Sequence, residues 1–184
     1  SGAQAVLAQS KQALIAAAQD AYIKSDDAVH NKADQFFNNP RTSYATLVIT
    51  MSDSQAQSTI VNQRIALESL FSSWQQMSNA LPQDPNQVDV NALAEATRSN
   101  LSQVSAFLDQ TAAGLTKAVP TTQYPTATIQ AYQSAIAAAR ANVSANSSAL
   151  AAALTAEKNA ESSLATAQSQ LRLKQAGATS DQIA

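Results

Sequence analysis

The chain has 184 residues, a formal net charge of −2 and only 13% charged residues, which suits one domain of ordinary size and does not suggest nucleic-acid binding. It has no cysteine and a single histidine, His30, so disulfides and thiolate metal sites are excluded, and neither a histidine-based metal site nor a Ser-His-Asp triad is expected. No run of about 18 apolar residues is present, so we expect this chain not to insert into a membrane.

The composition predicts helix. Alanine, the best helix former, occurs about 40 times, well above ordinary usage, whereas Gly and Pro number only 3 and 5. The breaks between the periodic stretches fall at residues 39–40, 82–85 and 120–125 and at Gly177. Four helices are therefore expected, over about residues 3–38, 54–81, 90–118 and 125–176.

Each of the first three helices carries a stripe of mainly apolar residues at helical spacing. Ser52 and Gln55 have the spacing of a capping box at the start of the second helix, and Asp89 is the expected N-cap of the third. In helix order, the stripes are Ile15, Ala18, Tyr22, Ser25, Val29 and Phe36; Ile60, Arg64, Leu67, Phe71, Trp74, Met77 and Leu81; and Leu93, Thr97, Leu101, Val104, Leu108, Thr111 and Leu115.

The fourth helix has the most regular pattern, a seam whose residues alternate steps of three and four without a slip. This 3.5-residue repeat predicts that the helix joins a left-handed coiled coil. Two polar seam residues, Asn146 and Glu157, are expected to fix the register of helix pairing. The seam consists of Ile129, Tyr132, Ile136, Ala139, Val143, Asn146, Leu150, Ala153, Glu157, Ala160, Leu164, Ala167 and Leu171.

The expected fold class is all-α, an antiparallel up-down four-helix bundle head on a two-helix coiled-coil hairpin stalk. Short connections make neighbouring helices antiparallel. At 1.5 Å per residue, the fourth helix would be roughly 75 Å long and the two middle helices roughly 40–45 Å, so the middle helices cannot cover all of it. We therefore expect residues 1–20 and 155–176 to form the stalk, and residues 21–154 to form the head.

Two shorter segments complete the expected organisation. The stretch 46–51 (TLVITM) is β-like, but because a lone strand would have no partner, we expect an extended connector rather than a sheet. Gly177 is expected to end the fourth helix, and Thr179 to Gln182 have capping-box spacing. Residues 177–184 are thus interpreted as the start of a following helix, and the chain as a piece of a longer protein.

The stretch 164–183, with LRLKQAGATSDQI from Leu171 to Ile183, resembles the helical-hairpin region of HlyD-type membrane fusion proteins, the periplasmic adaptor subunits of bacterial efflux and secretion systems. Many of these carry a similar Leu-x-Leu-x-x-Ala-Gly-Ala-x-Pro element between hairpin helices, and here Ser180 stands where proline is frequent. Residues 26–41, 52–55 and 103–109 are similar to the enlarged hairpin of some adaptor-like proteins.

The resemblance implies an extracytoplasmic scaffold in the periplasm or cell envelope, tethered to the membrane through parts outside this chain. Its implied partners are proteins: an inner-membrane transporter, an outer envelope component, and further copies of itself in the full-length protein. One signature of such adaptors, an arginine followed four residues later by leucine, is missing after Arg64, Arg98 and Arg140. No residues for docking to an outer-membrane channel are therefore assigned.

Three groups of residues are candidates for a site. His30 lies one helical turn from Asp26 and Asp34, which could join it at a metal ion, although a solvated, weakly paired face is the preferred interpretation and no metal is expected. The aromatic residues Tyr22, Phe36, Phe37, Phe71 and Trp74 could line a ligand pocket, but helical spacing favours core packing. Loop residues at one end of the molecule could form a partner-binding tip, with ordinary loop packing as the alternative; they are Pro40, Arg41, Tyr44, Pro120, Tyr124 and Pro125.

Two functions therefore stay open. The first is a structural and interaction scaffold, the α-hairpin domain of an exporter adaptor. The alternative is an extracytoplasmic four-helix-bundle domain that senses a ligand, as in chemoreceptor-like proteins. An enzyme is not expected, because the sequence has no nucleophile-base pair and no phosphate-binding loop, and no cofactor is implied.

Overall fold

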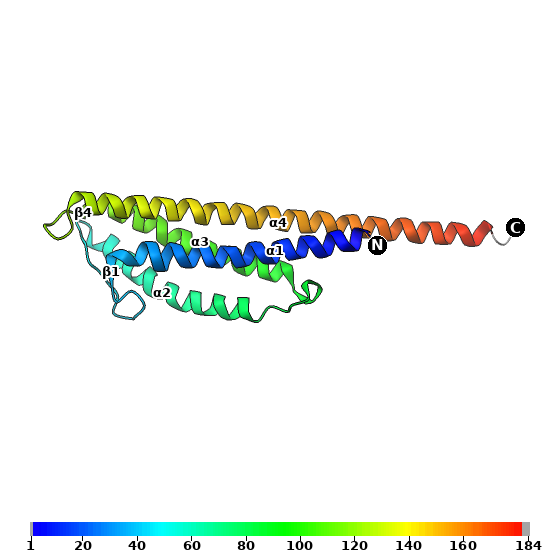
Figure 1. Ribbon diagram of the computed structural model, residues 1–184, viewed down its shortest axis with the longest axis horizontal. Helices are drawn as coiled ribbons and strands as arrows, with labels where there is room; N and C mark the ends of the chain where they lie inside the picture. The colour runs from blue at the N-terminus through cyan, green and yellow to red at the C-terminus, as the bar shows by residue number, and fades with distance from the viewer. Residues whose placement is uncertain (1, 182–184) are drawn as a thin grey trace.

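The computed structural model describes residues 2–181, with side chains through residue 177, and it is mostly helical. This confirms the all-α class. The long helices are α1 (Gly2–Asp26), α2 (Ser54–Asn79), α3 (Val90–Leu115) and α4 (Thr126–Asp181). Successive long helices run in opposite directions along the longest axis of the molecule (Figure 1). Shorter elements are η1 (Asp27–Ala33), η2 (Asp34–Phe36), η3 (Pro85–Gln87), β1 (Phe37–Asn38), β2 (Thr46–Leu47), β3 (Thr50–Met51) and β4 (Ala118–Val119).

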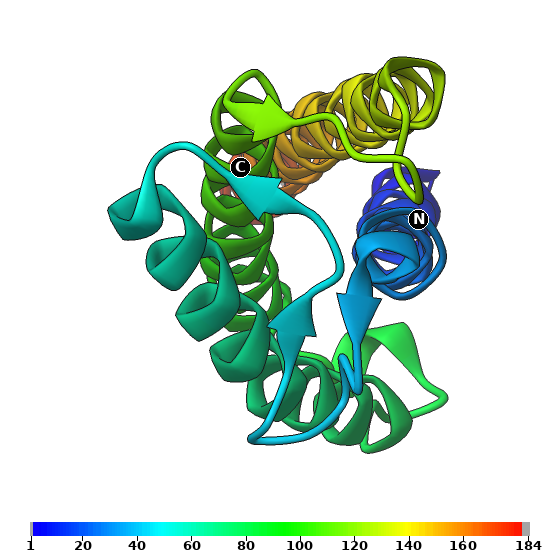
Figure 2. The same ribbon diagram turned by 90° about the vertical axis from the view of Figure 1, so that its left-hand side faces the viewer.

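The core lies where the apolar stripes of the four helices meet. α4 packs mainly on α1 and α3, and α2 packs mainly on α3. Figure 2, which views the molecule from one end, shows the four helices arranged around this interior. Residues with a relative exposure of 0 or 1% come from every long helix and from η1 and η2; they include Leu14, Val29, Phe36, Ile60, Trp74, Val104, Phe107, Leu108 and Ile136.

Local signals explain where the helices begin. The Asp89 carboxylate accepts a hydrogen bond from the backbone N–H of Ala92, as expected for the N-cap of α3. The N-cap of α2 is Asp53 rather than the expected Ser52, and its carboxylate accepts from the N–H of Ala56. Ser52 instead donates from its backbone N–H to the carbonyl of Lys117, because the chain is still extended at that point.

The first helix departs from the single α-helix expected over residues 3–38. Its α-helical part ends at Asp26, and the chain continues as the π-helical segment η1 and the 3₁₀ segment η2. A π-helix has wider turns than an α-helix, and it is frequent near functional sites. Beyond Asp26 the spacing of side chains thus differs from that of an α-helix, although the stripe residues Val29 and Phe36 are still buried.

The expectation that residues 46–51 form no sheet is wrong. β2 pairs with β1, with Phe37 opposite Leu47, and β3 pairs with β4, with Thr50 opposite Val119. Both ladders are antiparallel and only two residues long. The strand partners lie immediately after the first helix and immediately after the third, in segments that carry no β signal of their own.

Close approach at one ladder requires glycine. A Cβ added at Gly114 of α3 would lie 2.5 Å from Cδ1 of Ile60 and 3.1 Å from Sδ of Met51. Both side chains are buried, so neither can move away freely. Glycine therefore lets α2, α3 and β3 meet at this point.

The helix end expected at Gly177 is not found, since α4 continues through this residue to Asp181. A single glycine costs a helix only about 1 kcal/mol relative to alanine, and alanines flank it on both sides. Residues 182–184, where the following helix was expected to continue, lie outside the described residues.

The exposure of the α4 seam changes along its length. Val143, Leu150 and Ala160 are buried, whereas Leu171 is 56% exposed. In Figure 1 the last part of α4 extends past the N-terminal end of α1. Leu164 is half-buried and every residue from 165 to 177 is exposed, and the expected stalk over 155–176 stays a prediction.

Candidate functional site

The most unusual interior group is the guanidinium of Arg64, a residue of the α2 stripe that is fully buried. Its Nε and Nη2 donate to the two carboxylate oxygens of Asp34 at 2.6 and 3.0 Å, and its Nη1 donates to Oε2 of Glu68 at 3.1 Å. Burial alone would lower the pKa of Arg64, but the hydrogen bonds and charges of Asp34 and Glu68 raise the pKa above its ordinary value. A forked, two-bond pair of this kind fixes one geometry between η2 and α2.

His30 of η1 extends this network toward the surface. Its Nδ1 lies 2.6 Å from Oδ1 of Asp26, and its Nε2 lies 3.5 Å from Oε2 of Glu68. The side chain is only 7% exposed, so the solvated face expected for His30 is wrong. The ring is covered because it packs against α2, where it lies 4.9 Å from the ring of Phe71.

The metal arrangement considered around His30 is not formed. Both carboxylate oxygens of Asp34 accept hydrogen bonds from Arg64, and Asp34 does not join His30 and Asp26. Among residues 2–181, no group of three or more His, Asp or Glu side chains is placed to hold a metal ion. The charged groups here act on one another and tie the end of the first helix to α2.

The five aromatic residues singled out in the sequence pack against one another and against neighbouring rings. Tyr22 meets Phe71 and Trp74 edge-on, with ring centroids 6.2 and 5.6 Å apart. Phe36 meets Phe37 at 5.4 Å and Tyr132 at 5.3 Å. Such pairs stabilise a core beyond the area they bury. The arrangement favours the core interpretation over a ligand pocket lined by these rings.

The six tip residues lie at the same end of the molecule but in two separate loops (Figures 1 and 2). Pro40, Arg41 and Tyr44 belong to the connection between β1 and β2, whereas Pro120, Tyr124 and Pro125 belong to the connection between β4 and α4. The two loops therefore offer two contact areas instead of one continuous surface.

Three tip residues differ in what surrounds them. Tyr44 is 81% exposed, so its ring is open to a partner. Tyr124 is half-buried against the core. The pKa of Tyr132 is raised above its usual value by the burial of Tyr132 itself and by the nearby Tyr124. Arg41 lines a shallow pocket of about 380 Å³ whose other walls include Asp26, His30 and Glu68. Arg41 therefore belongs to the same surface region as the His30 network.

Sequence reasoning missed the pairing of Arg64 with Asp34. One signal was present, because a basic residue at a stripe position must find a buried counter-charge or leave the core. The counter-charge lies 30 residues earlier in the chain, however, so spacing alone could not identify it.

The two polar seam residues are buried in α4. Asn146 donates from its side chain to the carbonyl of Asn142, at 2.9 Å. Glu157 is 2% exposed, and its Oε2 is buried without a hydrogen-bond partner. A buried carboxylate without a partner lowers stability relative to an apolar residue at the same position. This cost is consistent with a role of Glu157 in selecting one register of helix pairing.

In comparisons with known proteins, no protein-family model, no curated protein and no solved structure matches this chain. The resemblance to adaptor hairpins therefore rests on the sequence motifs alone. Within residues 2–181, no helix combines the length and the apolar character that crossing a membrane requires.

Proposed function

We propose that this chain is a structural and interaction scaffold, the α-hairpin domain of an exporter adaptor that bridges an inner-membrane transporter to outer components of the cell envelope. The observation that carries the proposal is α4, one continuous helix of 56 residues. At 1.5 Å per residue it is roughly 84 Å long, far more than a compact core needs. Its seam is buried against α1 and α3 over much of this length.

The interior supports a mechanical role. The aromatic and aliphatic residues form one contiguous core, and the fully buried guanidinium of Arg64 is paired with Asp34. A satisfied ion pair favours one arrangement over others, although by itself it is weak support for high stability. Such an interior suits a part that holds a fixed shape more than one that opens around a ligand.

The proposal includes a finer fold assignment. Residues 21–154 would form a four-helix bundle head, and residues 1–20 would pair with 155–176 in a coiled-coil stalk. The burial of Glu157 and Ala160 supports the part of this stalk that α1 reaches. Leu164, Ala167 and Leu171 continue the apolar heptad spacing toward the end of α4 and favour pairing with a further helix. The extracytoplasmic location, the protein partners and the absence of catalysis belong to the same proposal.

Site-specific photo-crosslinking in the native host tests the proposal. A photoreactive residue replaces Tyr44, which is 81% exposed at the tip, in the full-length protein, and Gln19 on the exposed side of α1 serves as the control position. We expect the tip position to form adducts with an envelope component and the control position to form few. Replacement of residues 21–154 by a short glycine-serine linker should abolish export while the transporter stays in the membrane.

These experiments also distinguish the adaptor from the alternative, a ligand-sensing domain. Intact export after the replacement would overturn the adaptor assignment. The flanking sequence gives a second discriminator: lipoyl-like β segments on both sides would support the adaptor, whereas hydrophobic spans on both sides would support a sensor domain.

A further inference from the structure

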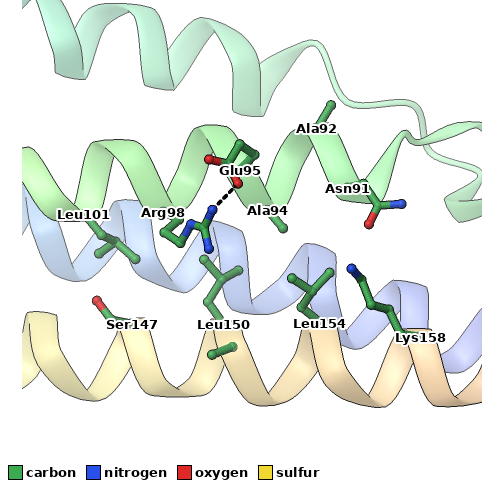
Figure 3. A pocket seen from close by; sticks show the side chains of 11 residues that line it. Asn91, Ala92, Ala94, Glu95, Arg98, Leu101, Ser147, Leu150, Leu154 and Lys158 are labelled. Atoms are coloured by element: carbon green, nitrogen blue, oxygen red, sulfur yellow. Dashed lines mark hydrogen bonds and ion pairs between the residues drawn. The ribbon is translucent and has the colours of Figure 1, made fainter.

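A groove runs between the first half of α3 and the middle of α4 (Figure 3). Its volume is about 570 Å³, within the range of small-molecule sites. The floor is apolar and consists of Ala94, Leu101, Leu150 and Leu154. Leu101 and Leu150 are only 2 and 4% exposed, so the floor is continuous with the core.

Small side chains keep the groove open. Ala94 on α3 and Ser147 and Ala151 on α4 lie where two packed helices would ordinarily interdigitate larger residues. Since Ala151 is exposed, a larger side chain at this position would meet no obstacle from the core. The groove therefore depends on residue choice and is not forced by the fold.

The rim of the groove carries an excess of positive charge. Arg98 and Lys158 are cationic and Glu95 is anionic, which leaves one net positive charge. Glu95 is paired with Arg98. The Lys158 ammonium forms no ion pair or hydrogen bond with the rest of the described chain. Lys158 is thus the rim cation whose charge is not already matched.

The position of Lys158 relative to the floor defines a polar end and an apolar end. Leu150, Leu154 and Lys158 are spaced by four residues and so lie on one face of α4. Their helical rise from first to last is roughly 12 Å. Figure 3 shows the two leucines between the guanidinium of Arg98 and the ammonium of Lys158, all pointing into the space between the helices.

We propose that this groove binds a single-chain amphiphilic anion, with its carboxylate at Lys158 and its alkyl chain along Leu154 and Leu150. Burial of the chain against the apolar floor supplies most of the affinity, and the ammonium group selects the charge. This site is independent of the adaptor role, since it requires only the described residues of α3 and α4.

Calorimetric titration of the 184-residue protein with decanoate below its micelle concentration tests the proposal. We expect saturable one-to-one binding, and clearly weaker binding of decyltrimethylammonium, which has the same tail and the opposite charge. Lys158→Gln should weaken decanoate binding by up to about fivefold, the upper value for one exposed ion pair. Lys174→Gln, on the same helix but outside the groove, is the matched control and should bind as the wild type does.

A second variant locates the alkyl chain. Ala151→Leu fills the groove from its exposed wall and should reduce decanoate binding more strongly than Lys158→Gln does, with unchanged helical content by circular dichroism. Equal binding of the two amphiphiles, unchanged binding in Ala151→Leu, or no saturable binding would each overturn the proposal. None of these results bears on export, so the adaptor function stands or falls by the separate crosslinking experiment.

Discussion

Asp34→Asn should be strongly destabilising, because it removes the charge that faces a fully buried guanidinium. Asp34 is 9% exposed and supplies two of the three hydrogen bonds to Arg64. Breaking a buried ion pair by removing one partner costs about 3–5 kcal/mol. Glu68 still accepts one bond, and the asparagine oxygen can accept another, so we expect the lower end, about 3 kcal/mol. For a chain of this length that corresponds to a fall of about 6–12 °C in Tm.

Thermal and urea unfolding followed by circular dichroism measure this loss. The matched control is Asp109→Asn, which breaks the exposed Arg140–Asp109 ion pair, whose side chains are 48 and 52% exposed, and should cost less than about 1 kcal/mol. Adding Arg64→Met to Asp34→Asn should recover part of the loss, because an apolar residue needs no counter-charge. Equal losses in Asp34→Asn and Asp109→Asn would refute the reasoning, since they would mean that Arg64 is not desolvated.

Four further variants test the placement of α4 and the Lys117–Asp53 ion pair. Leu150→Ala should cost about 2–4 kcal/mol in urea unfolding, whereas Leu171→Ala, at a seam position 56% exposed, should cost less than about 0.5 kcal/mol; similar losses would contradict the placement of α4. Glu157→Leu should raise Tm, because the Oε2 atom is buried without a hydrogen bond; a lower Tm would argue against that burial. Hydrogen bonds from Lys117 and the backbone hold the pKa of Asp53 below its ordinary value. The ionised Asp53 carboxylate therefore stabilises the fold above the ordinary carboxyl pKa, and this stabilisation is lost as pH falls through the lowered pKa. Asp53→Ala should therefore lower the urea midpoint at pH 7 and converge on the wild type in strong acid, and a constant difference would exclude this linkage.

Local sequence signals account for the helices. Abundant alanine, the proline-containing breaks and the Asp89 cap place four helices whose bounds in the structure differ from the expected ones by a few residues, apart from the two ends discussed next. The seam of α4 was also readable, because Ile136, Val143 and Leu150 follow a 3.5-residue repeat and are buried.

What could not be predicted depends on contacts between distant segments. Nothing in the sequence of η1 marks a π-helix, and the burial of His30 depends on contacts with Glu68 and Phe71, which lie far along the chain. Strands of two residues are too short for an alternating pattern, and β3 finds its partner β4 more than 60 residues away. Gly177 was predicted to end the fourth helix, because glycine often does so, but α4 continues through it.

The candidate site, too, could be predicted only in part from the sequence. Loop residues such as Tyr44 and Tyr124 could be assigned to one end, because proline and short connections mark where helices turn. That they lie in two loops follows from the chain order, because one loop precedes α2 and the other precedes α4. The apolar groove could not be predicted, since alanines on α3 and α4 indicate only helix until the two helices are placed beside each other.

The β3–β4 ladder joins the segment that precedes α2 to the segment that follows α3, with the Lys117–Asp53 ion pair and the Ser52–Lys117 backbone hydrogen bond beside it. The opposite end, where α2 leads into α3, has no such ladder among the described residues. Fraying of the helices should therefore start at that open end and travel toward the ladders. Amide hydrogen exchange would then show a gradient along the long axis, and a force applied near the N-terminus would peel the helices apart one turn at a time before it reached the loops.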